Sequence, residues 1–105
     1  MPEFAPVEEL FDLTGKGEVV TGATGQLGEA FCETLADLGA HIVVVARTET
    51  DCDALAERLT AEYERVISVP ADITDPDEVR ALAATVEDEF GRADIVVNNA
   101  YAGEL

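Results

Sequence analysis

Residues 21–28 read TGATGQLG and place a glycine-rich turn between a strand-like and a helix-like segment. The apolar run VV precedes the turn, and EAFCETLADL, whose apolar residues recur at helical spacing, follows it directly. Such a turn predicts a site for an anion, because the first N–H groups of a helix have no partners within the helix. The same glycines are also compatible with a tight turn that binds nothing.

Strand-like and helix-like segments alternate along the rest of the chain. Apolar, β-branched runs predict strands at residues 18–21, 41–46, 66–69 and 94–97. Helical periodicity and end signals predict helices at residues 27–38, 49–62 and 76–90. This order predicts the α/β class, as a three-layer Rossmann-like parallel sheet of about four strands in the order 3-2-1-4. The first two helices would cover one face of the sheet and the third helix the other.

Two of the helices carry more detailed signals. The third has Asp75 at the N-cap position, Pro76 at the first helical position, and Glu78 placed to complete a capping box. The first has a stripe at helical spacing that consists of Leu27, Ala30, Phe31, Thr34, Leu35 and Leu38.

The chain has 105 residues, of which 48% are apolar, so residues 1–105 form a single domain with enough apolar surface for a core. No apolar run of about 18 or more residues occurs, so a membrane-spanning helix is not expected. Residues 1–12 form an acidic leader without the pattern of a signal peptide, and a cytoplasmic location is expected. Cys32 and Cys52 are too few and too far apart to predict a metal site.

Acidic residues dominate the charge of the chain. Asp and Glu number 23 against 6 Lys and Arg, which gives a formal net charge of −17. Nucleic acid is a poor partner for this surface, since phosphate contacts need clusters of Lys and Arg. Self-repulsion of this size is largely screened at about 1 M salt, where the Debye length falls to roughly 3 Å. The composition resembles that of proteins from salt-in halophiles; the alternative is an ordinary acidic protein.

Polar residues directly follow three of the predicted strands. Arg47 lies about 20 residues beyond the glycines, where an arginine can pair with the 2′-phosphate of NADP and an acidic residue would bind the ribose of NAD. Asp72 could accept a hydrogen bond from an adenine amino group, and Asn98 and Asn99 could line a cleft. Each position also has a plainer interpretation, as a surface arginine, an acidic turn residue or a simple turn.

Five short motifs occur in a fixed order along nearly the whole chain: LTGK at 13–16, TGATGQLG at 21–28, AR at 46–47, ADI at 71–73 and NNA at 98–100. Together they resemble the short-chain dehydrogenase/reductase family. The resemblance implies a Rossmann fold that binds NAD(P)(H) and an oxidoreductase that transfers hydride between the nicotinamide and a carbonyl or secondary alcohol. The arginine after the second strand favours NADP(H) over NAD.

The resemblance also assigns roles to single positions. Gly22 would make the tight turn, Gly25 would admit the pyrophosphate, and Gly28 would let the helix pack close to the strand. Asp72 and Ile73 would flank the adenine, while Asn98 and Ala100 would lie along the nicotinamide-side ribose. The cofactor-binding residues expected in this way are Gly22, Thr24, Gly25, Gln26, Leu27, Gly28, Arg47, Asp72, Ile73, Asn98 and Ala100.

The sequence departs from the family at several places. The common loop TGxxxGxG would have its middle glycine at Gln26, whereas here it lies one place earlier. Gly17 and Glu18 stand in the first strand where the family has apolar residues, and a buried unpaired glutamate is costly. Tyr101 replaces the glycine that ends the NNAG motif of the family.

No catalytic residue is assigned, because the family's catalytic Ser and its Tyr-x-x-x-Lys pair would lie beyond Leu105. We therefore expect a truncated Rossmann half that is not catalytically complete alone. Its fourth strand would be an exposed edge that pairs with another copy or with a complementary C-terminal half. Two alternatives stay open: a non-catalytic nucleotide-binding or oligomerising module, and a truncated remnant that binds nothing.

Overall fold

A parallel sheet of four strands, in the order β3-β2-β1-β4, forms the centre of the computed structural model. The strands are β1 (Gly17–Thr21), β2 (His41–Val45), β3 (Val66–Ser68) and β4 (Ile95–Val97). The predicted sheet and its strand order are confirmed. The structure describes residues 10–100, so most of the predicted leader and Tyr101 lie outside the described residues.

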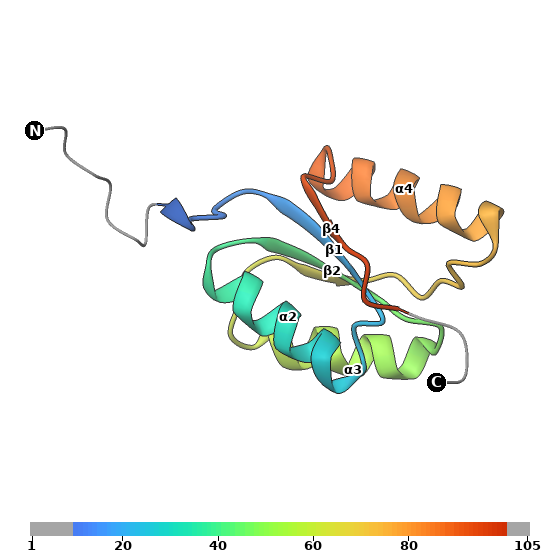
Figure 1. The fold of residues 1–105 in the computed structure, drawn as a ribbon, viewed down its shortest axis with the longest axis horizontal. Coiled ribbons are helices and arrows are strands. Elements are labelled where there is room, and N and C mark those ends of the chain that lie inside the picture. The colour runs from blue at the N-terminus through green and yellow to red at the C-terminus, as the bar shows by residue number, and fades with distance from the viewer. Residues whose placement is uncertain (1–9, 101–105) are drawn as a thin grey trace, which may run out of the picture.

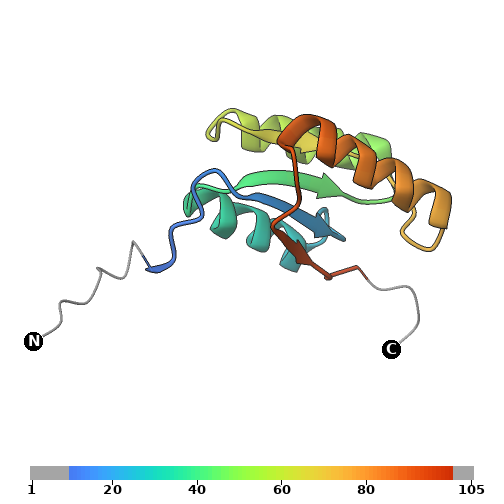
Figure 2. The ribbon, with the colours of Figure 1, turned by 90° about the horizontal axis from the view of Figure 1, so that it is seen from above.

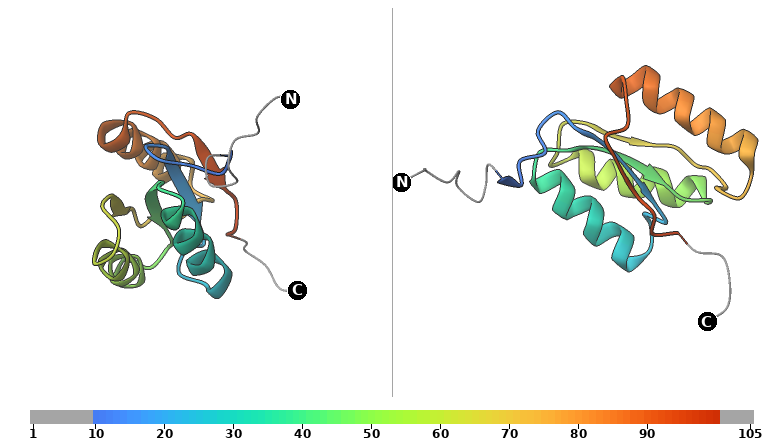
Figure 3. Two further views of the ribbon diagram at one scale, coloured as in Figure 1. Left: turned by 90° about the vertical axis from the view of Figure 1, so that its left-hand side faces the viewer. Right: turned by 45° about the horizontal axis from the view of Figure 1, so that its top comes forward.

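Three helices cover the two faces of this sheet. They are α2 (Gln26–Asp37), α3 (Glu49–Thr60) and α4 (Pro76–Phe90). Figure 1 shows α2 and α3 below the sheet and α4 above it, and the end-on view in Figure 3 shows the three layers. The three-layer arrangement expected from the sequence is therefore confirmed.

Strand β2 is buried on both of its faces and links two apolar cores. Ile42 and Val44 belong to the core beneath α2 and α3, whereas Val43 and Val45 belong to the core beneath α4. Viewed from above, β2 runs along the middle of the molecule between the helices (Figure 2). Continuous β-branched runs are typical of such strands, because alternate side chains face opposite helical layers.

The buried face of α2 differs from the predicted stripe. Leu27 is 60% exposed, and Ala30 and Thr34 are exposed as well. The residues that α2 buries are small ones, namely Gly28, Cys32 and Ala36, while Phe31 and Leu35 pack at the margin. The stripe thus contacts the core at Phe31 and Leu35 but not at Leu27, Ala30 or Thr34, because a helix that lies close to a sheet needs small residues along its line of contact.

The N-terminus of α4 is capped by Asp75, but the predicted capping box does not form. The Asp75 carboxylate accepts a hydrogen bond from Asp77 N at 2.9 Å. Glu78 instead accepts from Asp72 N at 3.2 Å, because Asp75 N already donates to Asp72 O at 3.0 Å. The helix is thus fastened to the turn that follows β3.

Strand β1 carries the two unusual residues, and the structure explains one of them. A side chain at Gly17 would bring its Cβ within 2.7 Å of Arg92 O, so only glycine fits beside the turn before β4. Asp94 accepts a hydrogen bond from Gly17 N at 2.9 Å in the same contact. The glycine therefore allows β1 and the start of β4 to approach closely.

Glu18 is fully buried between Ile42 of β2 and Ile95 of β4. Neither of its carboxylate oxygens has a hydrogen-bond partner among residues 10–100. Burial, followed by the nearby charge of Asp94, raises the pKa of this carboxyl. The cost expected from the sequence is therefore present in the fold.

Strand β4 lies at one edge of the sheet and pairs only with β1 within the described part of the chain. Its central residue, Val96, is 53% exposed. An edge strand with an exposed apolar side chain presents unpaired backbone groups to a further strand.

Candidate functional site

A cavity of about 860 Å³ lies at the carboxyl ends of the four strands. Its lining comes from residues 22, 24–27, 45–48, 71–74 and 99–100, which are strand ends and the turns that follow them. The strand order reverses between β1 and β4, at one side of this cavity. Open α/β sheets bind their ligands in the crevice at this kind of reversal, outside the carboxyl ends of the strands.

Most of the residues that the sequence assigned to a cofactor come together in this cavity. Those that line it are Gly22, Thr24, Gly25, Gln26, Leu27, Arg47, Asp72, Ile73 and Ala100. Gly28 and Asn98 are not among the lining residues. Gly28 is buried against the turn, and Asn98 is exposed.

The three glycines of the turn serve different purposes. Gly22 has φ +62°, and a Cβ on it would lie 2.9 Å from Ala100 Cα. A Cβ on Gly28 would lie 2.1 Å from Gly22 O, so the close approach predicted for this glycine is confirmed. Both positions thus require glycine for the fold itself.

Gly25 is different, because nothing in the described chain requires a glycine there. Its backbone is extended, with φ −78° and ψ 167°, and the nearest atom to a Cβ would be Gly22 O at an ordinary 3.6 Å. The missing side chain leaves open space on the wall of the cavity. That space suits a ligand whose atoms approach the backbone closely.

Two helix N-termini border the cavity without side-chain caps. Gly25 is the N-cap of α2 and Thr48 the N-cap of α3, and neither makes a side-chain capping hydrogen bond. Both residues line the cavity, and Arg47 lies directly before Thr48. Uncapped N–H groups and the positive ends of two helix dipoles favour an anion at each of these places.

Thr21 joins the turn after β1 to the segment after β4. Its buried hydroxyl donates to Val97 O at 3.2 Å and accepts from Asn99 N at 3.0 Å and Ala100 N at 3.1 Å. The Asn99 side chain donates to Gly22 O at 3.0 Å. Asn99, rather than Asn98, therefore lines the cavity and holds the glycine turn in place.

Asp72 is a half-buried carboxylate in the wall formed after β3. Its Oδ1 accepts from the Thr74 hydroxyl at 2.6 Å and from Thr74 N at 2.9 Å. These hydrogen bonds, chiefly the one from the hydroxyl, lower the pKa of Asp72, and the charge of Arg47 acts in the same direction. Asp72 therefore enters the site as a carboxylate at neutral pH.

The cavity wall contains no tyrosine, lysine or serine among the described residues. The Tyr63 hydroxyl lies elsewhere, between α2 and α3, and donates to Asp37 Oδ1 at 2.5 Å. No cluster that could hold a metal ion occurs within residues 10–100, and no helix there is long and apolar enough to cross a membrane. The described part of the site can therefore bind and orient a ligand, but it holds no acid–base pair.

Sequence reasoning missed several residues of the wall, including Thr48 and Thr74, and it assigned Asn98 rather than Asn99 to the cofactor although it considered both for a cleft. Thr48 carried a usable signal, because it directly precedes a predicted helix and follows Arg47. The choice between Asn98 and Asn99 depends on the side that each side chain faces, since successive residues of an extended segment point in opposite directions.

Comparison with known proteins agrees with this geometry. A sequence profile described as short chain dehydrogenase matches residues 16–104. A fatty acyl-CoA reductase of Mycobacterium tuberculosis is 37% identical over 95 residues, which make up 90% of this chain and 32% of that protein.

Two solved structures of enzyme complexes have the same fold. L-sorbose reductase from Gluconobacter frateurii, complexed with NADPH and L-sorbose, is 40% identical, with a TM-score of 0.82 over 87% of this chain and 35% of that one. A metagenomic short-chain oxidoreductase in complex with NADP is 35% identical, with a TM-score of 0.81 over 88% of this chain and 42% of that one.

This chain spans about a third of the length of the curated relatives that it matches. The matched part includes the glycine turn, the strand order 3-2-1-4 and the cavity at the carboxyl ends of the strands. The resemblance inferred from the five sequence motifs is therefore confirmed: the chain belongs to the short-chain dehydrogenase family.

Proposed function

We propose that this chain is the NADP(H)-binding part of a short-chain dehydrogenase and that the cofactor binds in the cavity at the carboxyl ends of the strands. One observation carries the proposal: two uncapped helix N-termini and Arg47 border a cavity beside Gly25, where the fold leaves room for a ligand. NADP carries phosphate groups at two separated places, and the cavity offers two separated anion sites. The relatives solved with NADPH and NADP support the choice of cofactor.

The lining residues suggest how the cofactor would be held. The pyrophosphate would lie against Gly25 and the N–H groups that begin α2, and the 2′-phosphate would lie against Arg47 and the N-terminus of α3. Asp72 and Ile73 would flank the adenine. Ala100, with the neighbouring segment of Asn98 and Asn99, would lie along the nicotinamide-side ribose.

The bound nicotinamide would supply or accept a hydride, and the substrate of the whole protein would be a carbonyl compound or a secondary alcohol. The described residues would contribute binding and orientation rather than proton transfer. We therefore propose that catalysis needs residues beyond those described here. Because the described residues would bind the cofactor without transferring a proton, the favoured alternative is a binding module without enzymatic activity.

Arg47→Gln is expected to reduce the affinity for NADPH by at least about tenfold, because a charge-assisted hydrogen bond contributes about 1.5–3 kcal/mol. The affinity for NADH, which lacks the 2′-phosphate, should differ by less than about twofold between the unchanged chain and Arg47→Gln. Fluorescence titration of both nucleotides measures the two effects. The control is Arg80→Gln, which removes an equal charge from the exposed outer face of α4. Equal losses for both nucleotides would contradict the assignment of Arg47.

We also propose that the chain works in a cytoplasm of high ionic strength and that β4 pairs there with a second copy or with a complementary C-terminal half. The exposed edge at Val96 and the net charge of −17 support this proposal. Light scattering should show a mass above that of one chain at about 1 M salt, where charge repulsion is screened. Val96→Lys should reduce self-association, since edge lysines oppose strand pairing. A monodisperse monomer at both low and high salt would argue against self-association.

A further inference from the structure

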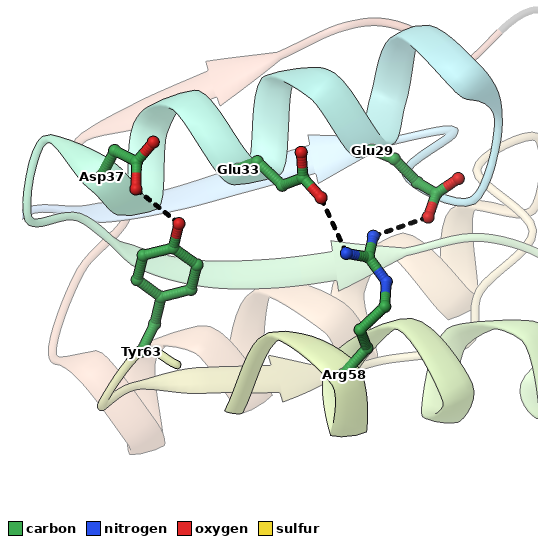
Figure 4. Close-up of polar contacts among 5 residues, drawn as sticks. All are labelled: Glu29, Glu33, Asp37, Arg58 and Tyr63. Atoms are coloured by element: carbon green, nitrogen blue, oxygen red, sulfur yellow. Dashed lines mark hydrogen bonds and ion pairs between the residues drawn. The ribbon is translucent and has the colours of Figure 1, made fainter. Parts of the chain in front are cut away.

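Helices α2 and α3 are joined by a row of polar contacts on the surface of the molecule (Figure 4). Arg58 of α3 extends two nitrogens toward carboxylates on successive turns of α2, Nη2 to Glu29 and Nη1 to Glu33, each at 2.7 Å. Tyr63 makes the next contact, to Asp37. The row thus begins at the first turn of α2 and ends at its last turn.

Glu29, at the beginning of this row, lies beside the proposed cofactor site. It belongs to the first turn of α2, directly after the glycine turn. A second hollow, of about 380 Å³, is lined in part by Glu29, Asp51 and Arg58. Thr24 lines both this hollow and the main cavity, so the two share a wall. The contact between Arg58 and Glu29 therefore borders the place where the pyrophosphate would bind.

The charge of Glu29 opposes the binding of an anion at this place. A carboxylate in the first turn interacts favourably with the positive end of the helix dipole, as a phosphate would, and it repels the phosphate. Glu33 adds a second negative charge one turn further along. Among the described residues that line the cavity, Arg47 is the sole cation. The cation of the adjoining hollow, Arg58, is the group that offsets these two carboxylates.

We propose that Arg58 is a positioning residue of the cofactor site, which holds the Glu29 carboxylate toward α3 and neutralises it so that the N-terminus of α2 accepts the pyrophosphate. This inference rests on the proposed function. If the contact were only a strut between two helices, its loss would leave NADPH binding nearly unchanged and independent of the charge of Glu29, because half-exposed ion pairs contribute little to stability.

The test is a double-mutant cycle on the chain, with NADPH titrated by fluorescence into the unchanged protein and into Arg58→Gln, Glu29→Gln and the double variant. We expect Arg58→Gln to weaken NADPH binding about fivefold at low salt, because the charge of Glu29 is then uncompensated. The double variant should return to within about twofold of the unchanged chain, since the repelling charge is removed. At about 1 M salt the loss in Arg58→Gln should largely disappear.

Two controls accompany the cycle. Arg80→Gln, which removes a cation from a pair on α4, should bind NADPH as the unchanged chain does. Arg58→Lys keeps the charge and should retain most of the affinity. The titrations at low salt use the lowest salt concentration at which every variant keeps the far-UV circular dichroism spectrum of the unchanged chain.

The outcomes separate this inference from the proposed function. If the double variant binds as weakly as Arg58→Gln, Arg58 does not act through Glu29 and the inference is wrong. The inference is also wrong if the unchanged chain binds NADPH and Arg58→Gln binds it equally well. If the unchanged chain binds neither NADPH nor NADH, the proposed function itself fails, and with it the anion site that Arg58 would protect.

Discussion

Gly25→Val is expected to weaken NADPH binding by at least about tenfold, or about 1.4 kcal/mol, and to leave the fold intact. Gly25 lines the cavity, and the described protein has no atom nearer than 3.6 Å to a Cβ there. The extended backbone at this residue is one that valine adopts readily. The added methyl groups would therefore occupy the space beside the first N–H groups of α2, where we place the pyrophosphate. Calorimetric titration and thermal unfolding of the same samples measure the two effects.

Gly28→Ala provides the matched contrast within the same turn. A Cβ on Gly28 would lie 2.1 Å from Gly22 O, so the turn and the helix must move apart to accept it. We expect a loss of stability of about 1–3 kcal/mol, as is typical of overpacking in a tight contact. If Gly25→Val lowers the stability as much as Gly28→Ala does, Gly25 is needed for the fold and the open space beside it is not a cofactor site.

Glu18→Val is expected to stabilise the chain at neutral and higher pH, by roughly 2 kcal/mol or more, because it removes a buried carboxylate without partners. Valine also suits a strand position flanked by Ile42 and Ile95. Denaturant unfolding of the two proteins in the same salt measures the difference in free energy.

The pH dependence of this effect follows from the raised pKa of Glu18. The folded protein holds this proton more tightly than the unfolded chain, in which the pKa is near the ordinary value of 4.5. The contribution of Glu18 to stability therefore falls as the pH rises from about 4.5 to the folded pKa, and it is constant above that value. The advantage of Glu18→Val should accordingly be smallest near pH 4.5 and largest above the folded pKa.

Two controls define what this result means. Glu57→Gln removes one negative charge from the exposed face of α3 and measures the benefit of a lower net charge alone. Glu18→Gln removes the charge of Glu18 but keeps a buried polar group, so its stability should lie between those of the unchanged chain and Glu18→Val. A gain no greater than that of Glu57→Gln would show that the buried carboxylate carries no special cost.

The sheet could be predicted from the sequence because β2 is a continuous β-branched run and because glycines stop two of the helices, Gly39 after α2 and Gly91 after α4. The apolar run at residues 41–46 is typical of a strand buried on both faces. Short connections between strands and helices are compatible with few sheet topologies. The inward face of α2 was predicted only in part, at Phe31 and Leu35. Its line of contact depends on how closely the helix approaches the sheet, and that approach is set by Gly28 and the turn after β1.

The candidate site could be predicted in outline but not in its contacts. Arg47 and Asp72 were found because the carboxyl ends of parallel strands meet at one edge of a sheet. The role of Asn99 could not be found in this way, since it depends on a hydrogen bond to Gly22 O across 77 residues of sequence. The contact of Arg58 with Glu29 likewise joins two helices whose relative position no local pattern specifies.

We infer that the cavity bordered by Gly25 and Arg47 binds a dinucleotide. Calorimetric titration of the unchanged chain with NADPH, at about 1 M salt where its charges are screened, tests this claim most directly. We expect one saturable site per chain, with NADPH bound more tightly than NADH. The absence of saturable binding for both nucleotides would contradict it.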